Sequence, residues 1–174
     1  MSARVANELI EWLRSYVSTR VDLRLQDERR CIAPHVVLDF GRQGILGGQR
    51  VPRTYGGLGL ALEDALRIGE QLGAIDLTLA AWVGQNSWLG IQPIVDAGSP
   101  AQKEDLLPDL AQGRTLASFA LTELAAGSDP NAIAATLRST SGGFRLHGDK
   151  SWIGNAGWAS VLVVFARQLD SEER

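Results

Sequence analysis

The spacing of the apolar residues changes at about residue 114, and this change divides the chain into two parts of different structural class. Before residue 114, apolar side chains recur every three or four residues, which is the spacing of one face of an α-helix. After it, they gather in short runs separated by turn-forming residues, which is typical of strands. The sequence therefore predicts an α+β protein with an all-α helical domain over residues 1–113 and a β domain over residues 114–174.

Five helices are predicted in the first part. The first carries an apolar stripe made of Val5, Leu9, Trp12, Leu13, Tyr16, Val17 and Val21. A second begins at Pro34 and ends near Gly41 or Gly44, because proline suits the first helical position and glycine the position after the last. A third covers about residues 63–72 and ends at Gly73.

The fourth helix is the most apolar segment of the chain and covers about residues 76–95. A helix of this composition is expected to be covered by protein on nearly every side. The sequence SPAQ at 99–102 has the form of a capping box with proline at the first helical position, and it opens a fifth helix that reaches about residue 112. Pro108 lies inside this helix and is expected to kink or shorten it.

Four strands are predicted in the second part, over residues 116–121, 133–138, 144–147 and 161–165. Ser141, Gly142 and Gly143 form a hairpin turn between the second and the third, and we expect antiparallel pairing. So few strands leave at least one sheet edge without a partner. The β domain is therefore expected to be an incomplete antiparallel β-barrel, completed by a further part of the protein or by another chain.

Composition excludes several classes of function. Apolar residues make up 45% of the chain and charged residues 21%, as in soluble globular proteins, and a net charge of −3 with scattered lysines and arginines excludes a nucleic-acid interface. No window holds the roughly 20 apolar residues of a membrane span. Cys31, expected within a helix, is the single cysteine and allows no intrachain disulfide, which favours the reducing cytoplasm. His35 and His147 lack further ligands at metal-binding spacing, so no metal is predicted.

Four stretches combine glycine-rich turns with apolar runs in a way that neither ordinary core nor ordinary loop explains. They are YGGLGL at 55–60, FALTELAAGSD at 119–129, LHGDKSWIGNAG at 146–157 and VLVVFAR at 161–167. In this order they resemble the acyl-CoA dehydrogenase family. The resemblance implies an N-terminal helical domain, a middle β-barrel and a C-terminal four-helix domain that closes a flavin site. It also implies an FAD-dependent oxidoreductase of fatty acid metabolism, which introduces an α,β double bond into an acyl thioester.

The same resemblance implies which residues contact the flavin. They are Phe119, Ala120, Leu121, Thr122, Gly127, Ser128, Trp152, Ile153 and Gly154. Thr122 would offer a hydroxyl and a backbone N–H to the pyrimidine edge, where negative charge accumulates during reduction. Gly127 and Ser128 would let the backbone approach the pyrophosphate and form an anion nest, and Ser128 would also contact the acyl carrier as a substrate-binding residue. Trp152 would pack against the ring and exclude water.

Two positions depart from the family pattern, and one functional group is not expected in this chain. Leu124 stands where the family usually has proline, which should loosen the turn. Gly154 stands where the family has a threonine or serine whose hydroxyl reaches flavin N5. The family's proton-abstracting carboxylate lies in the C-terminal domain, and Glu123 is not that base, so no catalytic residue is assigned here.

The resemblance leaves two functions open. In the first, the chain is part of an active dehydrogenase whose thioester carrier is coenzyme A or an acyl carrier protein, and whose electrons pass to an acceptor flavoprotein. Such a protein is expected to be a homo-oligomer or to be completed by a C-terminal chain, and the isolated 174 residues are expected to be inactive. In the second, the chain is a degenerate, non-catalytic subunit or scaffold, which Gly154 favours.

Overall fold

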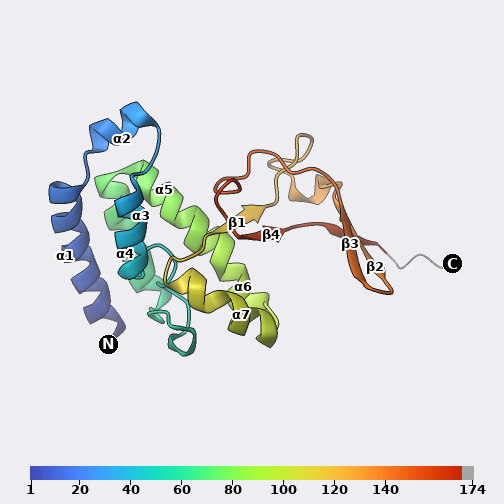
Figure 1. Ribbon diagram of the computed structural model, residues 1–174, viewed down its shortest axis with the longest axis horizontal. Helices are drawn as coiled ribbons and strands as arrows, with labels where there is room; N and C mark the ends of the chain where they lie inside the picture. Colours follow the sequence, from blue (N-terminus) through green and yellow to red (C-terminus); the bar gives the residue numbers. More distant parts are fainter. Residues whose placement is uncertain (170–174) are drawn as a thin grey trace.

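The computed structural model describes residues 1–169, in which a helical part is followed by a β extension that leads away from it (Figure 1). Within the helical part, α1 (Ser2–Arg20) lies against α4 (Leu62–Ile75). In the sequence, α2 (Leu23–Arg29) and α3 (Pro34–Arg42) come between α1 and α4. The α+β class and the order of its two parts are those predicted from the sequence.

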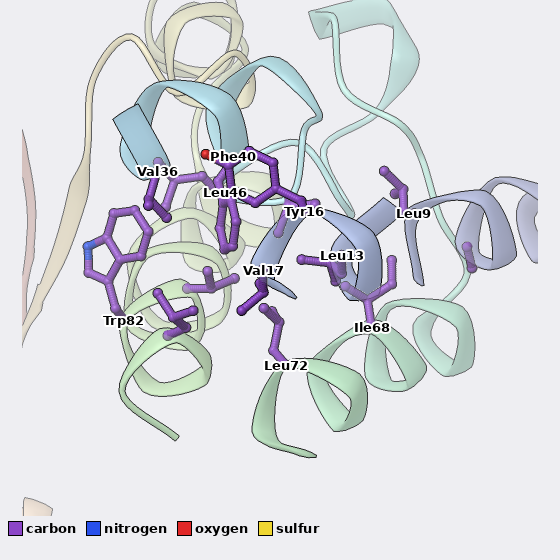
Figure 2. Close-up of a cluster of buried hydrophobic side chains, with 14 of the residues drawn as sticks. Leu9, Leu13, Tyr16, Val17, Val36, Phe40, Leu46, Ile68, Leu72 and Trp82 are labelled. Carbon is purple, nitrogen blue, oxygen red and sulfur yellow. The ribbon is translucent and has the colours of Figure 1, made fainter. Parts of the chain in front are cut away.

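The main core lies where α1, α3, α4 and α5 (Leu77–Gly84) meet, and Figure 2 shows its side chains pointing toward one another. Leu13, Phe40, Ile68 and Leu72 are fully buried there. The apolar stripe predicted for the first helix faces this cluster, because burial of such a stripe is what stabilises a helix of this length. Trp82 closes the cluster beside Phe40, with its nitrogen pointing away from the apolar side chains.

The predicted fourth helix is one continuous helical run from α5 to α6 (Gln92–Ala97), but its middle is different in kind. Residues Gln85–Ile91 form a π-helix, η2, which the periodicity did not predict. The run is also less covered than its composition indicated, since Leu77 is 77% exposed. The predicted capping box is present at the start of α7 (Pro100–Ala111), with its serine and glutamine side chains both bonded to backbone N–H groups.

Several local predictions were wrong. α2 was not predicted, and Cys31 follows it as an exposed bend residue instead of lying within a helix. α4 continues through Gly73, since a helical glycine costs only about 1 kcal/mol and the buried Leu72 holds this turn against the core. Pro108 does not shorten α7, which runs to Ala111, because its ring removes only one hydrogen bond from a helix otherwise packed on a second apolar cluster.

The second part contains the four predicted strands and one more. β1 (Ala117–Ala120) pairs with β4 (Val161–Val164), and β2 (Thr136–Thr140) pairs with β3 (Gly143–His147) and β5 (Arg167–Leu169). The β2–β3 hairpin is antiparallel, as predicted, but the pairings of β1 with β4 and of β2 with β5 are parallel. Parallel pairs need a long crossover, and the chain between β1 and β4 supplies one.

The β extension presents apolar side chains that no described residue covers. The whole of β3 is exposed, and Phe144 is 72% exposed. Leu146 and Leu162 are about half exposed on the same part of the chain. This surface agrees with the expectation of a β domain that other protein completes, because isolated hairpins with large exposed hydrophobic side chains are marginal in water.

Candidate functional site

The π-helix η2 lies directly against β1 and fixes where the site begins. Asn86 is fully buried, donates from Nδ2 to the Leu46 carbonyl at 2.7 Å, and accepts the Ala117 N–H at Oδ1 at 2.8 Å. Gly90 permits the contact, because a Cβ at that position would lie 2.7 Å from the Ala117 Cβ and 2.8 Å from its carbonyl carbon. β1 is therefore held by the helical part at its first residue.

Beyond β1 the chain makes a tight turn over residues 123–126. The Glu123 N–H donates to the Ala126 carbonyl at 3.0 Å, and the Ala126 N–H donates to the Glu123 carbonyl at 3.1 Å. Leu124 lies at the tip and is 86% exposed. With Leu124 in place of proline, both hydrogen bonds that close the turn are still formed.

Glu123 is the buried anchor of this turn, with a relative exposure of 8%. Its carboxylate accepts the N–H groups of Ala134 and Ala135 at 2.6 and 2.9 Å, and the Lys150 ammonium at 2.7 Å. The hydrogen bond from Lys150 and then the two backbone N–H groups lower the pKa of the Glu123 carboxyl from 4.5 to about 2. Glu123 is thus ionised and fully engaged, and it is not free to remove a proton.

Lys150 also brings the second predicted stretch alongside the first. Its ammonium donates to the Leu121 carbonyl at 2.9 Å, and the next residue, Ser151, donates its N–H to the Thr122 carbonyl at 2.9 Å. We call this set of contacts, made by Leu121, Thr122, Glu123, Lys150 and Ser151, the Glu123–Lys150 clamp. It joins two segments that are distant in the sequence and places Thr122 beside Trp152.

The stretch from Trp152 to Gly154 presents an aromatic ring outward. Trp152 is 88% exposed and has φ of 61°, a left-handed conformation that residues with a Cβ seldom adopt. Such a conformation persists only where the surrounding contacts hold it. Here the Ser118 hydroxyl donates to the Gly154 carbonyl at 2.6 Å, which ties the stretch to β1 from its other end.

Several hydrogen-bonding groups of the two stretches are available to hold a ligand. Within residues 1–169, neither the Thr122 hydroxyl nor its N–H has a hydrogen-bond partner, and the same is true of the N–H groups of Gly127 and Ser128. The hydroxyl and N–H of Thr122 suit the polar edge of a planar ring, and the N–H groups of Gly127 and Ser128 suit an anion. A separate open cavity of about 900 Å³ lies between α2, α5 and residues 153–158, and neither Trp152 nor Thr122 lines it.

The predicted site residues fall into three groups in the structure. Phe119, Ala120, Leu121 and Thr122 run along β1 and just past it, next to Trp152, Ile153 and Gly154. Gly127 and Ser128 follow the turn, and both are exposed. The ring of Phe119 packs on that of Phe165, with centroids 4.7 Å apart.

Sequence reasoning missed the residues that hold the site. Lys150 lies two residues before Trp152, in one of the four stretches singled out above. Its place directly after the turn was a signal for the buried ion pair that it forms with Glu123. Asn86 had no such signal, because it lies on a helix far from the site in sequence. Among residues 1–169 there is no group of three His, Cys, Asp or Glu side chains placed to hold a metal ion. In the same range, no helix combines the length and the apolar character that crossing a bilayer requires.

Comparison with known proteins gives a consistent result over nearly the whole chain. Residues 5–114 match the acyl-CoA dehydrogenase N-terminal domain, and residues 118–174 match the acyl-CoA dehydrogenase middle domain. A very long-chain specific acyl-CoA dehydrogenase, mitochondrial, from Macaca fascicularis is 39% identical over 122 residues, which are 69% of this chain and 19% of that protein. An L-prolyl-[peptidyl-carrier protein] dehydrogenase from Pseudomonas fluorescens is 38% identical over 129 residues, which are 72% of this chain and 34% of that protein.

A solved structure agrees with these relatives. The acyl-CoA dehydrogenase from Bacillus anthracis, crystallised in complex with FAD, superposes with a TM-score of 0.81 at 30% identity, over 94% of this chain and 28% of that one. The chain therefore spans about a fifth to a third of the length of these three proteins.

Proposed function

The chain belongs to the acyl-CoA dehydrogenase family, and from this premise we propose that it forms the flavin-facing wall of an FAD-dependent acyl-thioester dehydrogenase. The proposed reaction introduces a double bond between the α- and β-carbons of the acyl group. One observation supports it above the others. The Glu123–Lys150 clamp holds Thr122, with its hydroxyl and N–H unpaired among the described residues, beside the outward-facing ring of Trp152.

The residues present fit a flavin. When bound, FAD supplies the acceptor for a hydride from the β-carbon. Thr122 would donate hydrogen bonds to the polar edge of the ring, and Trp152 would cover a face of it with apolar surface. The unpaired N–H groups of Gly127 and Ser128 would bind the pyrophosphate, because successive N–H groups in a turn form an anion-binding nest.

This chain binds and orients in the proposal, but it does not remove the α-proton. Glu123, the buried carboxylate at the site, is occupied by Lys150 and two backbone N–H groups. A base must be within hydrogen-bond reach of the proton and free to accept it. We therefore propose that the proton-abstracting carboxylate is supplied by protein other than this chain.

The partners proposed are an acyl thioester of coenzyme A or of a carrier protein, and a flavoprotein that accepts the electrons. The relatives found here include enzymes named for each kind of thioester, so the family accommodates both. The exposed apolar side chains of the β extension support a homo-oligomer or a covering chain. The cytoplasm is proposed as the location because Cys31, the single cysteine, allows no intrachain disulfide.

The proposal is tested on the protein that the natural reading frame encodes. We expect it to copurify with flavin, seen as visible absorption, and to reduce an electron-accepting dye with an acyl-CoA or an acyl-carrier thioester. A protein that binds no FAD would contradict the proposal. Tight FAD binding without turnover of any thioester would instead support the non-catalytic alternative.

A further inference from the structure

The backbone conformation of Gly154 does not call for glycine, but another side chain occupies the space beside it. Its φ lies outside the left-handed region, although its neighbour Asn155 and the nearby Trp152 both lie inside it. A Cβ at position 154 would instead overlap the side-chain oxygen of Gln85, and would lie 2.6 Å from Gln85 Cδ and 2.9 Å from Gln85 Nε2. The Gln85 carboxamide therefore fills the place that a side chain at 154 would take.

Gln85 is held there by the start of the π-helix. It is the first residue of η2, and the next residue, Asn86, is buried and bonded to backbone groups on two sides. π-helical turns inside α-helices occur frequently at functional sites, because they redirect a side chain without ending the helix. The anchor at Asn86 thus fixes the backbone from which the Gln85 side chain reaches across to β1 and the 152–154 stretch.

The Gln85 carboxamide is also free to bind. Within residues 1–169 it has no hydrogen-bond partner, and its side chain is exposed. Gln85 lines the cavity of about 900 Å³ together with Ile153 and Asn155. A carboxamide carries two donor hydrogens and an acceptor oxygen, so it can replace a hydroxyl as a hydrogen-bond donor.

We propose that Gln85 supplies, from the π-helix, the hydrogen-bond donor of the flavin site at the place where Gly154 has no side chain. The inference rests on the proposed function, because it assigns the carboxamide to the flavin ring. A donor there stabilises the ring as negative charge accumulates on it, so it raises both flavin affinity and reduction potential. Gln85 and Gly154 then act as a pair, because the Gln85 carboxamide occupies in this conformation the space that a side chain at position 154 would take.

The first test measures this pairing without flavin. In the natural full-length protein, Gly154→Ser should displace the Gln85 carboxamide and lower the thermal midpoint only slightly, because the displaced atoms are the end of a flexible, exposed side chain. Adding Gln85→Ala should restore most of that loss, since the displaced side chain is then gone. Additive midpoints for the two substitutions would overturn the pairing.

The second test measures the donor. Gln85→Met keeps length and volume but removes the amide, and Gln85→Glu keeps the shape but replaces donors with a negative charge. We expect FAD affinity to fall by about 3–10-fold in Gln85→Met, as for one lost hydrogen bond. The flavin reduction potential should become more negative in the order Gln, Met, Glu, with the thermal midpoint nearly unchanged.

The control and the opposing outcomes are distinct. Gln92→Met is the control. It removes a carboxamide later in the same helical run, one that is bonded to Arg50 and Asp96. It should change neither the FAD affinity nor the flavin reduction potential. Gln85→Ala with Gly154→Ser should recover potential, since serine returns a hydroxyl to the vacated place. Wild-type protein that binds FAD with a potential insensitive to Gln85 would overturn this inference alone, whereas wild-type protein that binds no FAD would overturn the proposed function as well.

Discussion

Asn86→Ala should separate β1 from the helical part at a cost that the structure allows to be worked out. Asn86 makes two buried hydrogen bonds, from its amide to the Leu46 carbonyl and from the Ala117 N–H to its oxygen. After truncation the Leu46 carbonyl still accepts the Ser87 hydroxyl at 2.6 Å. The Ala117 N–H keeps no partner in a residue that is fully buried.

The magnitude follows from this difference. A buried donor left without a partner costs about 1–3 kcal/mol, and the small cavity adds to it, so we expect a loss of about 2–3 kcal/mol. Ser87→Ala is the matched control, because it removes a bond to the same carbonyl and leaves that carbonyl bonded to Asn86. It should cost about 0.5–1 kcal/mol.

Urea unfolding, followed by far-UV circular dichroism, measures both variants against the parent chain. A loss of 2–3 kcal/mol is a large share of the 5–15 kcal/mol typical of a domain, so the midpoint shift should be plain. Equal losses for the two substitutions, or a loss below about 0.5 kcal/mol for Asn86→Ala, would refute the argument that Asn86 is what satisfies Ala117 across the boundary.

Three further predictions concern the site. The pKa of Glu123 is lower in the folded chain than its ordinary 4.5, so its ionised form stabilises the fold above about pH 4.5, and this contribution should disappear as pH falls toward about 2. Glu123→Gln should therefore flatten the acid part of a plot of urea midpoint against pH. An unchanged plot would contradict the Glu123–Lys150 clamp. Thr122→Val should weaken FAD binding by about 2–10-fold, as for one hydrogen bond, at a nearly constant thermal midpoint, and equal affinity and turnover would remove Thr122 from the site. The 174-residue chain alone should associate, as light scattering would show, because Phe144 and its neighbours are uncovered. It should also retain little FAD and reduce no dye. A monomeric, yellow and active chain would refute this prediction.

The helices were predictable to the extent that their contacts are local. Helical spacing and capping residues identified α1, α3, α4 and α7, because each buries one stripe or carries its own start signal. The seven residues of α2 were missed, since so short a helix shows hardly two turns of periodicity. The three residues of β5 were too few to form a pattern.

The positions of the candidate site remain a prediction from the resemblance, and the contacts that build it were not predicted at all. Resemblance to a family pointed to Thr122 and Trp152, and strand spacing placed β1 and β4. Whether β1 and β4 pair in parallel depends on the path of the chain between them, which local pattern does not contain. The contacts that hold the site together, from Asn86 to Ala117 and from Ser118 to Gly154, join elements that local sequence treats as unrelated.

The adjacent residues Thr122 and Glu123 explain why a polar pair ends an apolar run. In extended backbone, successive side chains point to opposite sides. Glu123 points inward and satisfies three donors, from Ala134, Ala135 and Lys150, so burying its charge is tolerated. Beside the fixed Glu123, Thr122 is half-buried, and its hydroxyl has no partner among residues 1–169. Replacing Glu123 should therefore disturb ligand binding through the position of Thr122, even though the Glu123 carboxylate itself is occupied by protein groups.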